Sequence, residues 1–383
     1  MQSSVSAIYS SLKNAAFVLH EKKLISNLEL ISSVKKQAGI KIILALKGFS
    51  MWHTFPLVFE YLDGATASSL NEAKLIAEHM GTLAHSYFPV FLPHEFDEVA
   101  ALSSHITFNS LNQFHRFYPI LKEQYPAVSP GIRVNPGFSK VEVEMYNPTA
   151  PGSRLGIDLG QLESGLPEGV EGIHFHALCE NNSYDLEETL AVLESKIGHL
   201  LTQVKWVNMG GGHLMTHRDY DTEHLIGLLT RFREKYGVEI ILEPGSAIAW
   251  QTGDLVANIV DIVENHGVKT LMTDVSFTAH MPDTLEMPYR PEIVGANADG
   301  TGTYQYRIGG TSCLSGDFMY EYGFDTIPEI GDKLILRDMI HYTLVKTTMF
   351  NGVPHPDIGI IKQNGLYQSL RQFTFEDYEM RMD

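Results

Sequence analysis

Four polar groups of this sequence stand in or directly after short apolar segments. Lys47 follows ILAL, glycines 210–212 follow WVNM, Glu243 follows VEIIL, and His176 lies within GIHFHAL. An amine at the end of an apolar strand is poorly hydrated, which lowers its pKa and makes it a nucleophile able to form a Schiff base. The alternative is that the amine of Lys47 reaches water or pairs with a carboxylate.

The other groups add complementary chemistry. Glycines 210–212 let backbone N–H groups approach an anion and can form a phosphate cradle, although many glycine runs only turn the chain. Glu243 needs a cationic or N–H partner, because an unpaired buried charge is costly, and a protonated ring nitrogen would serve. An amine for an aldehyde, a cradle for a phosphate, a carboxylate for a ring nitrogen and an imidazole for a ring face together indicate pyridoxal 5′-phosphate.

Other interpretations of the histidines remain open. His174 and His176 are two residues apart on a predicted strand, so they share one face, and either can be a hydrogen-bonded histidine of the core or rim. Together with Cys179 they could also be zinc ligands. No compact second set of ligands completes such a site, so we predict no bound metal.

The elements that position these groups alternate between short apolar segments and longer amphipathic ones. Leu190, Leu193, Ile197 and Leu200 recur at helical spacing in one such amphipathic segment. Strands that alternate with helices are typical of a (β/α)8 barrel, whose reactive groups gather at the carboxyl ends of the strands. A doubly wound open sheet is the alternative. The eight predicted strands lie in the segments KIILAL, GATAS, HSYFPV, HITFN, GIRVN, GIHFHAL, WVNMG and VEIIL.

The pattern changes near residue 250. Segments such as DLVANIVDIVE, VKTLMTDVSF and TYQYRIGG are separated by Gly, Pro and Asn and lack long helices between them. This texture predicts a C-terminal, mostly β domain over residues 251–383, after a barrel over residues 21–250. We expect residues 1–20, which include the strand candidate NAAFVLH, to join the β domain.

Composition narrows the classes of function. The chain has 28 Lys and Arg against 46 Asp and Glu, a net charge of −18, which argues against nucleic acid or an anionic membrane as a partner. Two cysteines are too few for a disulfide framework and fit a reducing cytosol. No apolar run reaches about 18 residues, so we predict a cytoplasmic protein without a membrane span.

Several short motifs resemble, in order, those of the alanine-racemase-like, fold-type III pyridoxal-phosphate decarboxylases, and the resemblance covers nearly the whole chain. Within that superfamily, three longer strings are most similar to the carboxynorspermidine (carboxyspermidine) decarboxylases: HFHALCENN, DVSFTAHMPDTLEMPYRP and CLSGD. The short motifs are ALKG at 45–48, S-x-x-E at 69–72, SRLG at 153–156, GGG at 210–212 and EPG at 243–245.

The resemblance implies roles for individual residues. Lys47 would hold the cofactor as a Schiff base, His176 would stack on its ring, and Glu243 would meet the pyridine nitrogen. Cys313, carried by the β domain of the other subunit of a homodimer, would return a proton to the substrate, so that active sites are shared between subunits. Other implied contacts are Gly211, Gly212, Gly245, Ser246 and Tyr342 around the phosphate, Arg154 beside the cofactor and pairing with Glu72, and Asp317, Asp283 and His280 facing the distal amines of the substrate.

Two departures from related decarboxylases bear on the substrate. Ser246 replaces the arginine that commonly follows EPG, and Leu314 replaces the glutamate that follows the cysteine in enzymes acting on diaminopimelate. The resemblance therefore implies decarboxylation of a small cationic carboxylated polyamine, carboxynorspermidine or carboxyspermidine, in polyamine biosynthesis. The alternatives are a diaminopimelate or ornithine decarboxylase of the same fold, and a non-catalytic pyridoxal-phosphate-binding homeostasis protein. Asp317 could instead brace the CLSGD loop.

Overall fold

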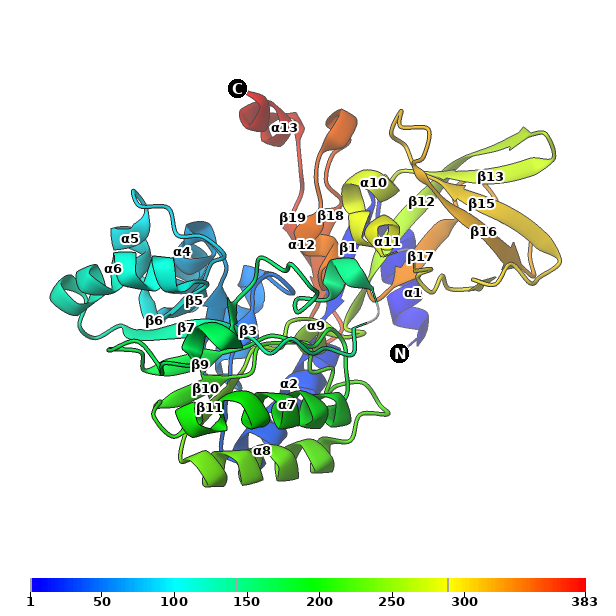
Figure 1. The fold of residues 1–383 in the computed structure, drawn as a ribbon. Coiled ribbons are helices and arrows are strands. Elements are labelled where there is room, and N and C mark those ends of the chain that lie inside the picture. The colour runs from blue at the N-terminus through cyan, green and yellow to red at the C-terminus, as the bar shows by residue number, and fades with distance from the viewer. Residues whose placement is uncertain (1, 142, 288) are drawn as a thin grey trace. The chain divides into compact units, whose positions relative to one another are not determined.

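The chain forms two compact units, each with its own sheet (Figure 1). One unit comprises residues 27–248, and the other combines residues 1–26 with residues 249–383. The structure, a computed structural model, describes residues 2–141, 143–287 and 289–383. Both predicted parts of the fold, the (β/α)8 barrel and a mostly β second part, are confirmed.

The barrel is a parallel sheet that closes through one interrupted strand. β2 and β3 lie on either side of Ile43, and the sheet runs from β2 to β3 through all the other strands. The N–H of Ile43 donates to the carbonyl of Leu242 (2.9 Å) and the N–H of Leu44 to that of Gly64 (3.0 Å), so this stretch is bonded to both neighbours. In sheet order the strands are β2 (Lys41–Ile42), β11 (Glu239–Leu242), β10 (Trp206–Asn208), β9 (Gly172–His174), β7 (Ser129–Asn135), β6 (Ser103–Phe108), β5 (Ala84–Tyr87), β4 (Ala65–Ala67) and β3 (Leu44–Ala45), with β8 (Ile157–Asp158) beside β7.

Four helices of this unit begin at a residue whose side chain caps the helix, and each buries an apolar face: α4 (Leu70–His79), α6 (Leu111–Gln124), α7 (Ser183–Leu201) and α8 (Thr222–Tyr236). α7 starts with a capping box in which Asn182 accepts the N–H of Asp185. Its four predicted core positions, Leu190 to Leu200, are all buried. The other helices are α2 (Glu21–Ala38), in which the division between the units falls, η1 (Trp52–Thr54), α3 (Phe55–Phe59), α5 (Phe96–Ala101), η2 (Glu144–Tyr146), η3 (Leu159–Leu162) and α9 (Ser246–Ala249).

The second unit is built on a mixed sheet that joins both ends of the chain. β1 (Ala16–His20) pairs antiparallel with β12 (Gly253–Asn265) and parallel with β18 (Asp357–Ile361), so the blue N-terminal strand lies beside an orange one in Figure 1. The sheet continues through β13 (Val268–Thr273), β15 (Tyr304–Gly309), β16 (Phe318–Phe324) and β14 (Ala296–Asn297) on one side and β19 (Tyr367–Arg371) on the other, with β17 (Lys333–Arg337) also on β12. Its helices are α1 (Gln2–Ser11), α10 (Phe277–His280), α11 (Pro282–Glu286), α12 (Thr343–Lys346), η4 (Phe350–Gly352) and α13 (Phe375–Met382).

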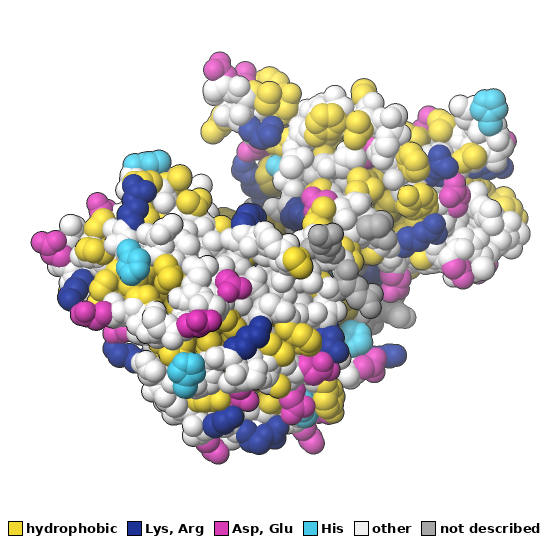
Figure 2. Space-filling view, in the orientation of Figure 1, with side chains coloured by type: hydrophobic (Ala, Val, Ile, Leu, Met, Phe, Trp, Pro, Cys, Tyr) yellow, Lys and Arg dark blue, Asp and Glu magenta, His cyan; other side chains and the backbone are white. Residues whose placement is uncertain are grey.

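The surface carries its acidic excess in a dispersed form. Figure 2 shows acidic and basic side chains interspersed over the visible face. Among the described helices, none combines the length and the apolar character needed to cross a membrane.

Candidate active site

Lys47 stands two residues after β3, at the carboxyl end of the first barrel strand. Its neighbours Leu46 and Gly48 are buried, whereas the side chain of Lys47 keeps access to solvent at the strand end. The protein atoms that surround its amine still displace much of the water around it and so lower its pKa, the charge of Arg133 lowers it further, and Glu243 opposes both effects. A lowered pKa increases the fraction of neutral amine, which is the form that attacks an aldehyde.

Glu243 directly follows β11 and is held by two neighbouring strands. Asn208, the last residue of β10, donates its Nδ2–H to Oε1 of Glu243 (2.6 Å), and Nε2 of His174 lies 3.8 Å from Oε2. Burial alone would raise the pKa of Glu243, but His174 and Asn208 outweigh it and bring the pKa to about 2. Burial also lowers the pKa of His174. The partners of Glu243 therefore keep it ionised, and a carboxylate is suited to a protonated ring nitrogen.

His176 presents a neutral imidazole two residues after β9. Its Nδ1 accepts the backbone N–H of Gly211 (3.2 Å), which fixes the orientation of the ring. Burial lowers the pKa of His176 well below its ordinary value, and the charges of Lys47 and Arg133 lower it further. An uncharged, oriented imidazole is suited to stacking on an aromatic ring.

Glycines make the strand ends approach one another closely. A Cβ added at Gly48 would lie 2.6 Å from Cα of Gly245, and one added at Gly212, whose φ is +88°, would lie 2.3 Å from the carbonyl oxygen of Leu178. A side chain at either position would clash with the neighbouring backbone, so the glycines of the predicted phosphate cradle and of its surroundings are required for this close approach. Ser246, at the start of α9, is buried. The lysine, the carboxylate, the imidazole and this cradle fit pyridoxal phosphate.

Arg133 belongs to the same group, although the sequence analysis did not single it out. It lies within β7, is 4% exposed, and its guanidinium stands 4.7 Å from the ring centroid of Tyr87. Its Nη2 donates to the carbonyl of His176 (3.5 Å). An arginine inside the apolar segment GIRVN is as unusual as a lysine at a strand end, so the same reasoning could have found it.

Arg154 has an exposed side chain, and its backbone is bound to the barrel. Asn109 donates its Nδ2–H to the carbonyl oxygen of Arg154 (2.8 Å). Glu72, the partner implied by the resemblance, accepts the backbone N–H of Ser68 (2.6 Å), and its own N–H donates to Oγ of Ser69 (3.2 Å). Among the described residues, the S-x-x-E motif therefore caps α4, and the ion pair between Arg154 and Glu72 is not formed.

The remaining predicted residues lie in the second unit, which we describe by itself. Cys313 is exposed, and its backbone N–H donates to Oδ1 of Asn351 (3.0 Å). Asp317 is 4% exposed, and its two carboxylate oxygens accept the N–H groups of Thr278 and Ser312 (both 3.0 Å) and the hydroxyl of Ser312 (2.6 Å). These contacts support the alternative in which Asp317 braces the CLSGD loop.

Three further residues of this unit are held by local contacts. Oδ2 of Asp283 accepts the hydroxyls of Tyr289 and Thr343 (both 2.8 Å), whereas its Oδ1 has no hydrogen-bond partner within the described residues. His280 is fully buried, and its Nδ1 accepts the N–H of Ser276 (3.1 Å). Tyr342 precedes α12 with a φ of +26°, a conformation that L-residues rarely adopt.

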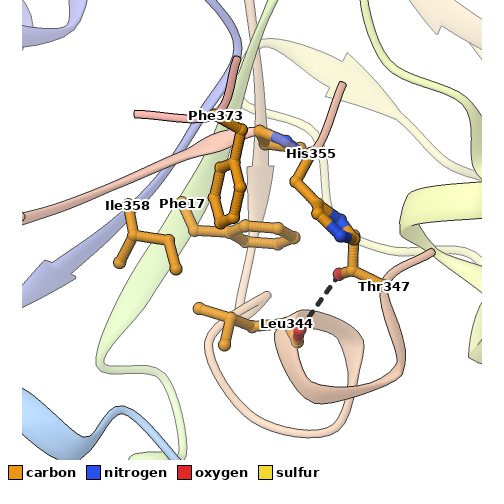
Figure 3. Close-up of a pocket in the computed structure, with 7 residues that line it drawn as sticks. Phe17, Leu344, Thr347, His355, Ile358 and Phe373 are labelled. Carbon is orange, nitrogen blue, oxygen red and sulfur yellow. Dashed lines mark hydrogen bonds between the residues drawn. The ribbon is translucent and has the colours of Figure 1, made fainter. Parts of the chain in front are cut away.

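Two further observations concern an apolar pocket of the second unit and the arrangement of metal-ligating side chains. A pocket of the second unit is mainly apolar, with the rings of Phe17 and Phe373 beside Leu344 and Ile358 (Figure 3). Across residues 2–141, 143–287 and 289–383, no three His, Cys, Asp or Glu side chains gather as a set of metal ligands. The zinc interpretation of His174, His176 and Cys179 therefore has no support.

Comparison with known proteins identifies the family. The model of the family described as "Pyridoxal-dependent decarboxylase, C-terminal sheet domain" matches residues 16–340. A carboxyaminopropylagmatine decarboxylase of Synechocystis sp. is 47% identical over 97% of this chain and 96% of its own length. A carboxynorspermidine/carboxyspermidine decarboxylase of Campylobacter jejuni is 44% identical over 97% of this chain and 99% of its own. A crystal structure of carboxynorspermidine decarboxylase with norspermidine, also from Campylobacter jejuni, has a TM-score of 0.89 at 42% identity and covers 97% of this chain and 100% of that one. The chain belongs to the pyridoxal-dependent decarboxylases, and its cofactor is pyridoxal 5′-phosphate.

Proposed function

We propose that the chain decarboxylates carboxynorspermidine or carboxyspermidine and so forms norspermidine or spermidine. The observation that carries this proposal is the likeness to the Campylobacter jejuni decarboxylase, which extends over nearly all of both chains. The ionised Glu243 and the amine of Lys47, whose charges influence each other, support it chemically.

In this proposal each residue at the carboxyl ends of the barrel strands has a separate role. When bound, pyridoxal phosphate supplies an electron-accepting ring next to the α-carbon that loses its carboxylate. Lys47 would hold the cofactor through its aldehyde carbon and would give up that bond to the amine of the substrate, which would leave the lysine amine free, and Glu243 would keep the ring nitrogen protonated. His176 supports one face of the ring, Arg154 stands beside it, and Gly211, Gly212, Gly245 and Ser246 surround the phosphate.

The second unit would supply the remaining groups. Cys313 would protonate the α-carbon after CO₂ has left, and Tyr342 would contact the phosphate. We propose that this unit acts on the barrel of the other chain in a homodimer, so that each active site is shared. Asp283 and His280 are the candidates for the distal amines, because each is buried with one polar atom lacking a partner within the described chain. Asp317 remains a weaker candidate, because its carboxylate is already bonded to Ser312 beside its own loop and to Thr278 of α10.

Carboxyaminopropylagmatine is a second candidate substrate. The relative from Synechocystis sp. that is named for it is 47% identical to this chain. That substrate differs at its distal end, where a planar guanidinium replaces an ammonium, and the two cations require different hydrogen-bond geometries.

A parallel product assay tests the proposal. The purified protein, loaded with pyridoxal phosphate, is offered carboxynorspermidine, carboxyspermidine, carboxyaminopropylagmatine, diaminopimelate and ornithine, and CO₂ and amine products are measured. We expect turnover of a carboxylated polyamine and none by Lys47→Ala. Preferential turnover of diaminopimelate or ornithine would overturn the proposal, and preference for the agmatine derivative would favour the second candidate.

A further inference from the structure

Tyr87, the last residue of β5, touches several groups of the site at once. Its ring is stacked on that of His174, with centroids 5.2 Å apart and an interplanar angle of 20°. The guanidinium of Arg133 stands 4.7 Å from the same ring. Arg133 and His174 are direct partners on the adjacent strands β7 and β9, so one tyrosine from β5 contacts both.

His174 has few other means of holding its position. The ring is 2% exposed, its Nε2 lies 3.8 Å from Glu243, and its Nδ1 has no hydrogen-bond partner in the described part of the chain. The 3.8 Å separation from Glu243 is longer than a hydrogen bond, so this contact alone orients the ring weakly. The stack on Tyr87 is a second contact that can keep the ring facing Glu243.

The hydroxyl of Tyr87 is connected by hydrogen bonds to a second part of the site, the loop that carries Arg154. It donates to Oδ1 of Asn109 (2.8 Å), an oxygen that also accepts the N–H of Gly156 (2.8 Å). Nδ2 of Asn109 donates to the carbonyl of Arg154 (2.8 Å). Asn109 is 9% exposed, so these bonds are protected from water, and the SRLG segment at 153–156 is fixed to the barrel through one amide.

We propose that Tyr87 is a positioning residue with two arms: its ring holds His174 against Glu243, and its hydroxyl, through Asn109, fixes the segment that carries Arg154. The inference rests on the proposed function only where it predicts effects on turnover. The ring arm acts through His174 on Glu243, the proposed partner of the ring nitrogen of the cofactor, and the hydroxyl arm acts through Asn109 on the segment 153–156.

The two arms can be separated by substitution. Tyr87→Phe keeps the stack and removes the hydroxyl, Tyr87→Leu removes both, and Asn109→Ala releases the 153–156 segment. Tyr118→Phe, on the half-buried tyrosine of α6, is the matched control. Circular dichroism checks folding, titration of the cofactor-free protein gives the dissociation constant of pyridoxal phosphate, and the visible band of the bound cofactor reports the state of its ring.

For Tyr87→Leu we expect the dissociation constant to rise about tenfold and the visible band to shift, because Glu243 loses its oriented neighbour. Tyr87→Phe should keep the wild-type affinity and band but lose about two- to tenfold in kcat/KM. Asn109→Ala should show a similar or larger loss, and adding Tyr87→Phe to it should cost nothing more, because both act on one network.

Wild-type affinity and band in Tyr87→Leu would overturn the ring arm. Additive effects of Tyr87→Phe and Asn109→Ala would overturn the hydroxyl arm, and this arm stays testable if Tyr87→Leu does not fold. If the wild-type protein decarboxylates no carboxylated polyamine, the proposed function fails, whereas the cofactor affinity and the visible band still decide the ring arm.

Discussion

Glu243→Gln isolates the charge that faces the ring nitrogen while preserving the shape of the side chain. Oε1 of the new amide can still accept the Nδ2–H of Asn208, which lies 2.6 Å from Oε1 of Glu243. What disappears is a carboxylate whose pKa of about 2 keeps it ionised at every pH of use. The substitution therefore tests electrostatics with little change in packing.

The magnitude follows from the loss of one charge-assisted hydrogen bond. Such a bond is worth roughly 1.5–3 kcal/mol, and about 1.4 kcal/mol corresponds to a factor of ten. The dissociation constant of pyridoxal phosphate should rise about tenfold to a hundredfold. kcat should fall as well, because a ring that is not protonated accepts electrons from the α-carbon less well.

The assay compares Glu243→Gln with Glu239→Gln on the same strand. Glu239 forms an exposed ion pair with Lys41 (2.9 Å), and exposed pairs contribute about 0–1 kcal/mol, so this control should bind cofactor and turn over as the wild type does. Titration of the cofactor-free proteins and steady-state kinetics give both quantities. Wild-type affinity and wild-type kcat in Glu243→Gln would refute the reasoning.

Four further predictions follow from the same structure. Borohydride reduction and peptide mapping should place the pyridoxyl group on Lys47, and finding it on another lysine would contradict the site. Mixing inactive Lys47→Ala chains with inactive Cys313→Ala chains should restore part of the activity, and no recovery despite demonstrated subunit exchange would count against a shared site. Burial lowers the pKa of His85 from 6.5 to about 3, so between these pH values the unfolded state binds a proton that the folded state does not. The stability of the protein should therefore fall as the pH drops from about 6.5 towards 3. The slope of Tm against pH should be smaller in His85→Gln and unchanged in the exposed control His94→Gln. Asp317→Asn places an amide N–H against one of the two backbone donors, the N–H of Thr278 or that of Ser312. The free energy of unfolding should fall by about 1–3 kcal/mol, and the cofactor affinity should not change. Full stability together with a lower kcat/KM would instead favour a substrate contact.

The architecture and the centre of the site could be predicted because they depend on pattern. Eight apolar segments alternating with amphipathic ones predicted the barrel, and parallel strands bring their carboxyl ends to one edge. Lys47, His176 and Glu243 each stand at such an end, and the backbone brings these ends together. A Cβ added at Gly211 would lie 2.4 Å from the carbonyl oxygen of Glu243 and 3.8 Å from the ring of His176, and Gly48, next to Lys47, packs against Gly245. The pattern therefore predicted that these residues stand at one edge of the barrel, and their individual roles stay predictions.

The remaining features of the site depend on contacts between side chains that are far apart in the sequence. Tyr87 in HSYFPV has no feature that distinguishes it from a core tyrosine, and its proposed role emerges only from the ring of His174 and the guanidinium of Arg133, which two other strands supply. For Asp317 the resemblance implies a substrate contact, and that stays a prediction, whereas the structure adds bonds that sequence pattern does not indicate: its carboxylate accepts the N–H groups of Ser312 and of Thr278 in α10. Hydrogen bonds between side chains and irregular backbone have no sequence period, so pattern alone cannot predict them.

The position of β1 in the second sheet also sets an order of events during synthesis. Phe17 of β1 is paired with Leu255 of β12 and with Ile358 of β18, so the strand must wait for partners that are made much later. The barrel unit, residues 27–248, is continuous and can acquire its strands as they leave the ribosome. The nascent chain therefore carries an unpaired apolar strand until β12 and then β18 have been made, and the sheet of the second unit is completed after that of the barrel.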